Sequence, residues 1–163
     1  MTYPYLPGPS PHGRLPASLA FVTGMAYAAV SAYWGLGGTG MLDTVGGALA
    51  TEGRAGSPAV FAGVWGACLL KVAGSVLPLM AVGFFGNREV VGLARWFSWV
   101  QAVVLTGYGF VLTFVGLLVQ AEVISASSDA DLHALAWHTF LWDPWFLLWG
   151  LLITAALVRS RPR

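Results

Sequence analysis

The sequence predicts an all-α fold, a polytopic membrane protein built as an antiparallel bundle of four transmembrane helices. Hydrophobic residues make up 57% of the 163 residues and charged residues only 9%, whereas an average soluble domain is about 25% charged. The mean hydropathy is +0.72. Most of the chain falls into long apolar segments that match a hydrocarbon core of about 30 Å.

Four spans are predicted, with boundaries set by proline, glycine and charged residues. A proline-rich arm over residues 1–16 should be extended and flexible, and residues 159–163 should form a tail. Ser57 and Pro58 are typical of a helix start, as N-cap and first helical residue. The spans themselves are expected at about 17–36, 58–85, 96–121 and 132–158.

Pro78 lies inside the second span and should disturb it. Proline has no N–H, so the carbonyl near Gly74 loses its helical partner and a kink is expected. Membrane helices tolerate such a proline where neighbouring groups satisfy the freed carbonyl.

Small residues recur at helical spacing on two spans and predict close helix contacts, because they let backbones approach. On the third span packing alone would explain the pattern, although a pocket-lining role is open as well. The first span carries Ala20, Gly24, Ala28, Ser31 and Gly35, and the third carries Ala102, Thr106, Gly109, Thr113, Gly116 and Gln120.

The arginines predict the orientation of the bundle. Arg54 lies on one side of the predicted membrane, and the other six lie on the opposite side, namely Arg14, Arg88, Arg95, Arg159, Arg161 and Arg163. By the positive-inside rule both termini should be cytoplasmic. The net charge is only +1 and no basic run tracks a phosphate backbone, so nucleic acid is not an expected partner.

Lys71, the only lysine, lies near the middle of the second span. A charge at that depth costs about 3 kcal/mol on insertion scales, so it needs a partner or a function. Asp143 precedes Pro144 in the fourth span at a similar predicted depth, and we expect the two charges to pair. Two alternatives stay open: such a pair could serve only to fix helix register, and Asp143 could instead cap a helix at the interface.

The candidate site is built around these two charges. Asp143 or Glu122 would act as general acid, with Lys71 adjusting its acidity and His138 nearby. Aromatic and polar residues would form the ligand-binding wall, namely Trp145, Trp149, Tyr108, Thr113 and Trp34. His133 and His138 are five apart, which argues against a shared metal site. No metal and no cofactor are expected.

Three kinds of function fit such a site. The first is a protein that binds, and as an enzyme transforms, a lipid-like or isoprenoid molecule from the bilayer. The second is a small proton-coupled transporter or an oligomeric channel-like assembly that uses Asp143 and His138. The third is a structural subunit of a membrane complex. The single polar cluster beside aromatic residues favours the first.

Three short motifs carry a resemblance to a known family. They are Tyr33-Trp34-Gly35-Leu36-Gly37-Gly38, Leu42-Asp43-Thr44-Val45-Gly46-Gly47 and Leu141-Trp142-Asp143-Pro144-Trp145. On these motifs the chain resembles, over nearly its whole length, an uncharacterised family of small four-helix membrane proteins found mainly in actinobacteria. The resemblance implies four helices and a bacterial plasma membrane, and it implies no activity.

Overall fold

The computed structural model describes residues 11–160, and this part of the chain is helical without strands. Four helical runs are long and apolar enough to cross a membrane. Three are single helices, α1 (Pro11–Gly35), α3 (Pro58–Ala81) and α4 (Arg88–Gln120). The fourth joins α5 (Leu132–Trp137), the π-helical turn η2 (His138–Trp142) and α6 (Asp143–Arg159). The predicted all-α, four-helix architecture is confirmed.

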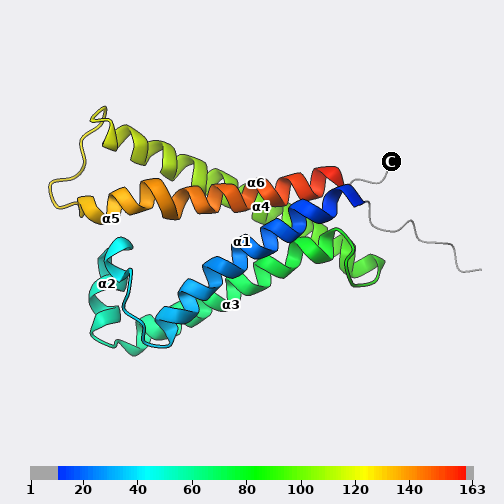
Figure 1. Cartoon of the computed structure of the whole chain (residues 1–163), viewed down its shortest axis with the longest axis horizontal. Coiled ribbons are helices and arrows are strands. Elements are labelled where there is room, and N and C mark those ends of the chain that lie inside the picture. The colour runs from blue at the N-terminus through cyan, green and yellow to red at the C-terminus, as the bar shows by residue number, and fades with distance from the viewer. Residues whose placement is uncertain (1–10, 161–163) are drawn as a thin grey trace, which may run out of the picture.

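The helices are arranged as two antiparallel pairs. α1 packs along α3, and α4 packs along α6, while α1–α6 and α3–α4 contacts join the pairs. Figure 1 shows the pairs meeting near the described ends of the chain, here called the terminal end, and diverging toward the other end. That loop end carries the short helices η1 (Leu42–Thr44) and α2 (Gly47–Arg54) together with α5.

Aromatic side chains join the two pairs toward the loop end. The Tyr27 ring stacks on Trp142, with centroids 5.6 Å apart, and contacts Phe146 at 4.9 Å. Trp34 meets Trp142 at 5.9 Å. These rings from α1, η2 and α6 form one buried cluster with Leu42 and Val64. Large aromatic side chains therefore hold the two pairs together toward the loop end, whereas small residues mediate close helix contacts elsewhere.

The small-residue stripes mediate the close contacts within each pair. A Cβ atom on Gly109 of α4 would overlap the backbone of Leu147, and one on Gly116 would overlap Thr139. On α1, Gly24 leaves no room for a Cβ atom beside Ser75 and Trp149. Gln120, at the end of the α4 stripe, is exposed instead. The α4 stripe therefore serves packing against η2 and α6.

Two of the helices begin earlier than expected. α1 starts at Pro11, so residues 11–16 continue the first span instead of belonging to the arm, and residues 1–10 lie outside the described part. α4 starts at Arg88 because the side chain of Asn87 caps it, accepting a 2.9 Å hydrogen bond from the Val90 amide. A polar first turn is thereby part of the helix.

The Gly74 carbonyl, which Pro78 leaves without a helical donor, accepts a hydrogen bond from the neighbouring helix α4. Gln101 Nε2 donates to Gly74 O at 3.0 Å. Gly74 also lets the amide come close, since a Cβ there would lie only 2.8 Å from Gln101 Nε2. The proline in α3 is therefore compensated by a side chain of α4, as membrane helices require.

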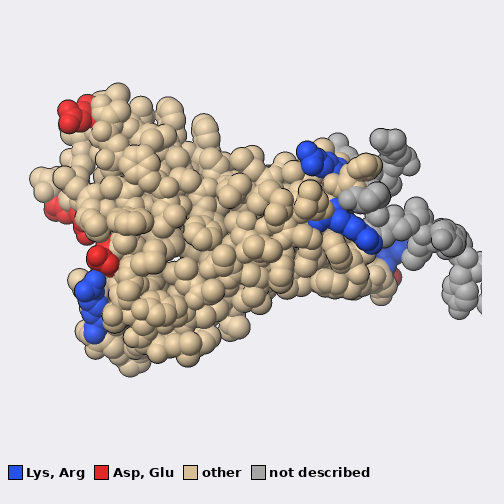
Figure 2. Space-filling model, in the orientation of Figure 1, with Lys and Arg blue, Asp and Glu red and all other residues tan. Residues whose placement is uncertain are grey.

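Figure 2 shows the charges gathered at the two ends of the molecule, with an uncharged surface between them. Most Lys and Arg side chains in this view lie toward the terminal end, and the acidic ones gather at the loop end. At the loop end Arg54 lies 3.6 Å from Asp43. Such an uncharged belt between polar ends is typical of a membrane-spanning bundle.

Candidate functional site

Lys71 lies half-buried on α3 and contacts α1 through two neutral groups. Its Nζ donates to Ser31 Oγ at 2.7 Å and lies 3.9 Å from the centroid of the Tyr27 ring. The hydroxyl accepts one ammonium proton, and the ring face attracts the positive charge. Within residues 11–160, no carboxylate lies within ion-pair distance of this ammonium.

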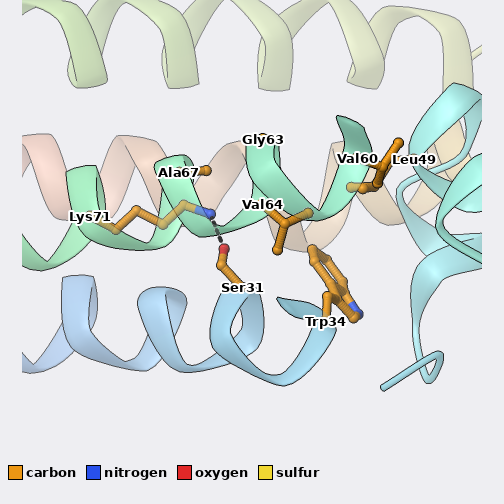
Figure 3. A pocket seen from close by; sticks show the side chains of 8 residues that line it. All are labelled: Ser31, Trp34, Leu49, Val60, Gly63, Val64, Ala67 and Lys71. Atoms are coloured by element: carbon orange, nitrogen blue, oxygen red, sulfur yellow. Dashed lines mark hydrogen bonds between the residues drawn. The ribbon is translucent and has the colours of Figure 1, made fainter. Parts of the chain in front are cut away.

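A pocket of about 280 Å³ opens between the loop-end halves of α1 and α3, with α2 at its far end. Figure 3 shows the Lys71 side chain running along α3 to its hydrogen bond with Ser31 at one end of the pocket. The rest of the lining is almost entirely apolar. The lining residues are Ser31, Trp34, Leu49, Val60, Gly63, Val64, Ala67 and Lys71.

Asp143 is buried, with 4% of its surface exposed, and its partner is His138. His138 Nδ1 lies 3.3 Å from Asp143 Oδ1, and the Asp143 amide donates to the His138 carbonyl. That backbone bond is the five-residue bond of a π-helix, which puts residues five apart on one face. The π-turn therefore brings the acid and the imidazole together.

The two neighbours of His138 fix where its protons lie. Its Nε2 lies 3.2 Å from the carbonyl oxygen of Val45, which only accepts, so Nε2 must carry a hydrogen. If the ring is neutral, Nδ1 accepts and Asp143 must be the protonated donor. If the ring is charged, Nδ1 donates to an ionised Asp143. Either way one proton lies between Nδ1 and Oδ1, and the pair is neutral overall.

The predicted pairing of Lys71 with Asp143 is wrong, since each has another partner. His138 already neutralises the acid, because the π-turn places the two side chains on one face. The lysine ends instead at Ser31 and Tyr27 on α1. Tyr27 stacks on Trp142, which precedes Asp143, so an aromatic ring stands next to both groups.

The loop that follows α1 is fastened to η2 beside this pair. Besides the His138–Val45 bond, Trp142 Nε1 donates to Thr44 O at 3.2 Å. Asp43 in the same loop lies 3.8 Å from His133 Nε2. The loop leads into α2, whose Leu49 lines the pocket. The position of the pocket's loop-end wall therefore depends on contacts with η2.

The other predicted site residues are dispersed over the bundle. Trp34 lines the pocket and donates to Gly40 O at 2.8 Å. Trp145 donates to Thr23 O at 3.1 Å, and Trp149 is buried in the core where the four helices meet. Thr113 is partly buried on α4, with its hydroxyl buried and unpartnered in the described part of the chain.

Tyr108 and Glu122 lie at the surface. Tyr108 is 49% exposed, with its ring edge-on to Phe146 at 5.3 Å. Glu122 follows α4 in a left-handed conformation, φ 58°, and is exposed. Only Lys71 and Trp34 of the predicted set therefore line the pocket. The other predicted wall residues, namely Trp145, Trp149, Tyr108 and Thr113, do not line it.

Two residues of the lysine site were not predicted as functional. Ser31 was counted only in the small-residue stripe, and Tyr27 was not singled out. Their spacing offered a signal, since Tyr27, Ser31 and Trp34 follow each other by four and three residues and so share one helix face. One polar and two aromatic side chains on one face of a span can contact and stabilise a buried charge on the neighbouring span.

These features define a small bundle of four helical runs, each long and apolar enough to cross a membrane, with an apolar pocket that ends at a lysine. The chain belongs to the family described as "Protein of unknown function (DUF3995)", which matches residues 24–153. The match includes the whole pocket lining and the His138–Asp143 pair. Comparisons with curated proteins and with solved structures gave no match.

Proposed function

We propose that this protein binds a lipid-like or isoprenoid molecule in the pocket between α1 and α3. The observation that carries the proposal is the pocket itself, apolar along most of its length and ending at the Lys71 ammonium. Ligand sites are typically concave and mostly apolar, with a few polar groups that fix orientation. A molecule with an apolar chain and one polar end matches that pattern.

The proposed setting is the plasma membrane of an actinobacterium, with both termini cytoplasmic. The orientation is supported by the arginines at the terminal end, among them Arg14, Arg88 and Arg95, which the positive-inside rule assigns to the cytoplasm. In this orientation the pocket occupies the outward half of the bundle. Its ligand would enter from the outer leaflet.

Binding, and not acid catalysis, is the function that the geometry favours for this pocket. Asp143 and His138 do not line it, and they satisfy each other. Glu122 is exposed beyond the end of α4. A general acid must come within hydrogen-bond reach of its substrate, and none of the three is placed to do so in the pocket.

A matched pair of glycine substitutions tests ligand binding. Gly63 lines the pocket, whereas Gly66 does not, and a Cβ atom at either position meets nothing within 4 Å. Gly63→Trp should fill the pocket without overlapping the backbone, and Gly66→Trp is the control. Native mass spectrometry of the purified proteins should show a bound lipid-like adduct in the parent and in Gly66→Trp, and its loss in Gly63→Trp.

Equal adducts in all three proteins would mean that the lipid coats the surface and does not occupy the pocket. An absence of adduct in all three would favour a structural subunit. Either result contradicts the proposed function. Thermal unfolding of the two variants checks that both remain folded, so that a lost adduct reports on the pocket.

The His138–Asp143 pair supports a second candidate, an oligomeric channel-like assembly that conducts protons. The pair holds one proton between its two side chains, at the loop end of the bundle. Intramembrane acids paired with histidine are common in proton relays. In proteoliposomes with a pH gradient, the parent should collapse the gradient and Asp143→Asn should not. A parent protein that leaves the gradient intact contradicts this candidate.

A further inference from the structure

Among the described residues, the Lys71 ammonium is a cation without an anion. Its two partners, Ser31 Oγ and the Tyr27 ring, are both neutral. Two nearby acids have partners of their own, since Asp43 lies beside Arg54 and Asp143 beside His138. Buried charges are normally paired, because an uncompensated charge in an apolar environment is costly. The charge of Lys71 is therefore available to a molecule that enters the pocket.

Among the side chains that line the pocket, only Ser31 offers this cation an acceptor. An ammonium group carries three N–H donors, and the Ser31 hydroxyl accepts only one of them. The third polar side chain of the lining, Trp34, is a donor and is already bonded to Gly40 O. All other lining side chains are aliphatic or glycine. A ligand that completes the hydrogen bonding of Lys71 must therefore bring an acceptor of its own.

The same arrangement disfavours a cationic ligand. Aromatic faces bind cations, but the Tyr27 face is occupied by the lysine of the protein itself, 3.9 Å from the ring centroid. The acid that could attract a ligand cation, Asp143, is neutralised by His138. A positively charged head group would meet Lys71 at the polar end of the pocket and be repelled.

On these observations we propose that the ligand is a single-chain amphiphile with one negatively charged head group, bound by Lys71 and Ser31 while its chain lies along α3. This inference rests on the proposed ligand-binding function. A carboxylate suits one ammonium and one hydroxyl, and a phosphate monoester shares the same chemistry. The chain would follow Ala67, Val64 and Val60 toward α2.

Charge selectivity tests the inference with four probes of equal chain length, namely decanoate, decyl phosphate, decanol and decylamine. Binding to the full-length protein in nanodiscs is measured by native mass spectrometry, with thermal stabilisation as a second readout. Decanoate or decyl phosphate should bind at least tenfold more tightly than decanol, and decylamine most weakly. The tighter anion identifies the head-group class. Lys71→Met should remove the preference for anions and leave decanol binding unchanged.

Two further variants separate the charge from the pocket. Gly63→Trp should block all four probes, because it fills the space that the chain occupies. Ser31→Ala keeps the ammonium but removes one contact to the head group, so the preference for anions should weaken without disappearing. Lys71→Gln repeats the charge removal should Lys71→Met fail to fold.

The outcomes distinguish the two proposals. Equal binding of decanoate and decanol, blocked by Gly63→Trp but unaffected by Lys71→Met, would overturn the anionic head group and leave ligand binding standing. Preferential binding of decylamine would overturn it too, as would an equal loss in Ser31→Ala and Lys71→Met. If no probe binds in a manner sensitive to Gly63→Trp, the proposed function itself fails.

Discussion

Gln101 Nε2 on α4 donates a 3.0 Å hydrogen bond to the carbonyl oxygen of Gly74 on α3, the carbonyl that Pro78 leaves without a helical donor. A backbone defect in one helix is thus tied to a polar side chain on the next. The contact also fixes the register of α3 and α4 near the point where the four helices meet. It predicts a specific coupling between Gln101 and Pro78, which act on the same carbonyl.

We expect Gln101→Leu to lower the free energy of unfolding by about 1 kcal/mol, because the Gly74 carbonyl loses its donor. In a Pro78→Ala background the amide of residue 78 can supply the missing hydrogen bond, so the same substitution should cost less. Thermal or denaturant unfolding of the four proteins in detergent gives the coupling. Equal costs of Gln101→Leu in both backgrounds would contradict this account of the proline.

Lys71 and Asp143 should behave as independent charges. Each has other partners, so the coupling energy between Lys71→Met and Asp143→Asn should stay below about 0.5 kcal/mol. Lys71→Met alone should leave stability unchanged or raise it by up to about 3 kcal/mol, since it removes a costly charge without stranding an acid. A double-mutant cycle in thermal unfolding measures both. If the double variant is much more stable than the sum of the two single effects predicts, Lys71 and Asp143 do form an ion pair.

Because His138 and Asp143 share a proton, substitutions at the two positions should lower the free energy of unfolding by different amounts. The side-chain amide introduced by Asp143→Asn would donate to Nδ1 of a neutral imidazole, so this substitution should cost less than about 1 kcal/mol. His138→Ala removes the bond to Val45 and leaves Asp143 buried without its partner, so it should cost about 1–3 kcal/mol. Unfolding measurements compare the two, and a larger loss in Asp143→Asn would contradict the proton assignment.

The orientation of the bundle can be tested at the two ends of α4. In a Cys68→Ala background, single cysteines replace Glu89 near the terminal end and Ser127 beyond the loop end, both exposed positions. A membrane-impermeant thiol reagent should label Ser127→Cys in intact cells and Glu89→Cys only after permeabilisation. Labelling in the reverse order would place both termini outside, and labelling of both in intact cells would contradict a membrane-crossing α4.

The sequence predicts the helices well because bilayer thickness dictates their length and because small residues at helical spacing have few other uses. It also predicts that the Gly74 carbonyl needs a partner, since the missing N–H of Pro78 is a local property. The partner itself, Gln101, depends on how α3 and α4 are set against each other. That register is a property of the whole bundle.

The site was less predictable for the same reason. Depth along a span indicates which charges share a level, but it does not indicate which helix faces meet. Lys71 and Asp143 are similar in predicted depth, yet the lysine faces α1, and the π-turn gives the acid a partner on its own segment. In a regular helix, residues three or four apart share a face, whereas in a π-turn residues five apart do so. A pattern based on regular helices therefore misses this pairing.

The glycines of α4 offer a matched test of how the bundle is packed. Gly109 lies where a Cβ atom would overlap the backbone of Leu147, whereas a Cβ atom on Gly107 meets nothing within 4 Å. Gly109→Ala should therefore lower the unfolding free energy by at least about 1–3 kcal/mol, because backbone atoms cannot give way as a flexible side chain can. Gly107→Ala lies in the same helix and should stabilise it by up to about 1 kcal/mol, since alanine has the higher helix propensity. Thermal unfolding in one detergent compares the two. Similar effects of both substitutions would show that α4 and α6 do not pack closely at this point.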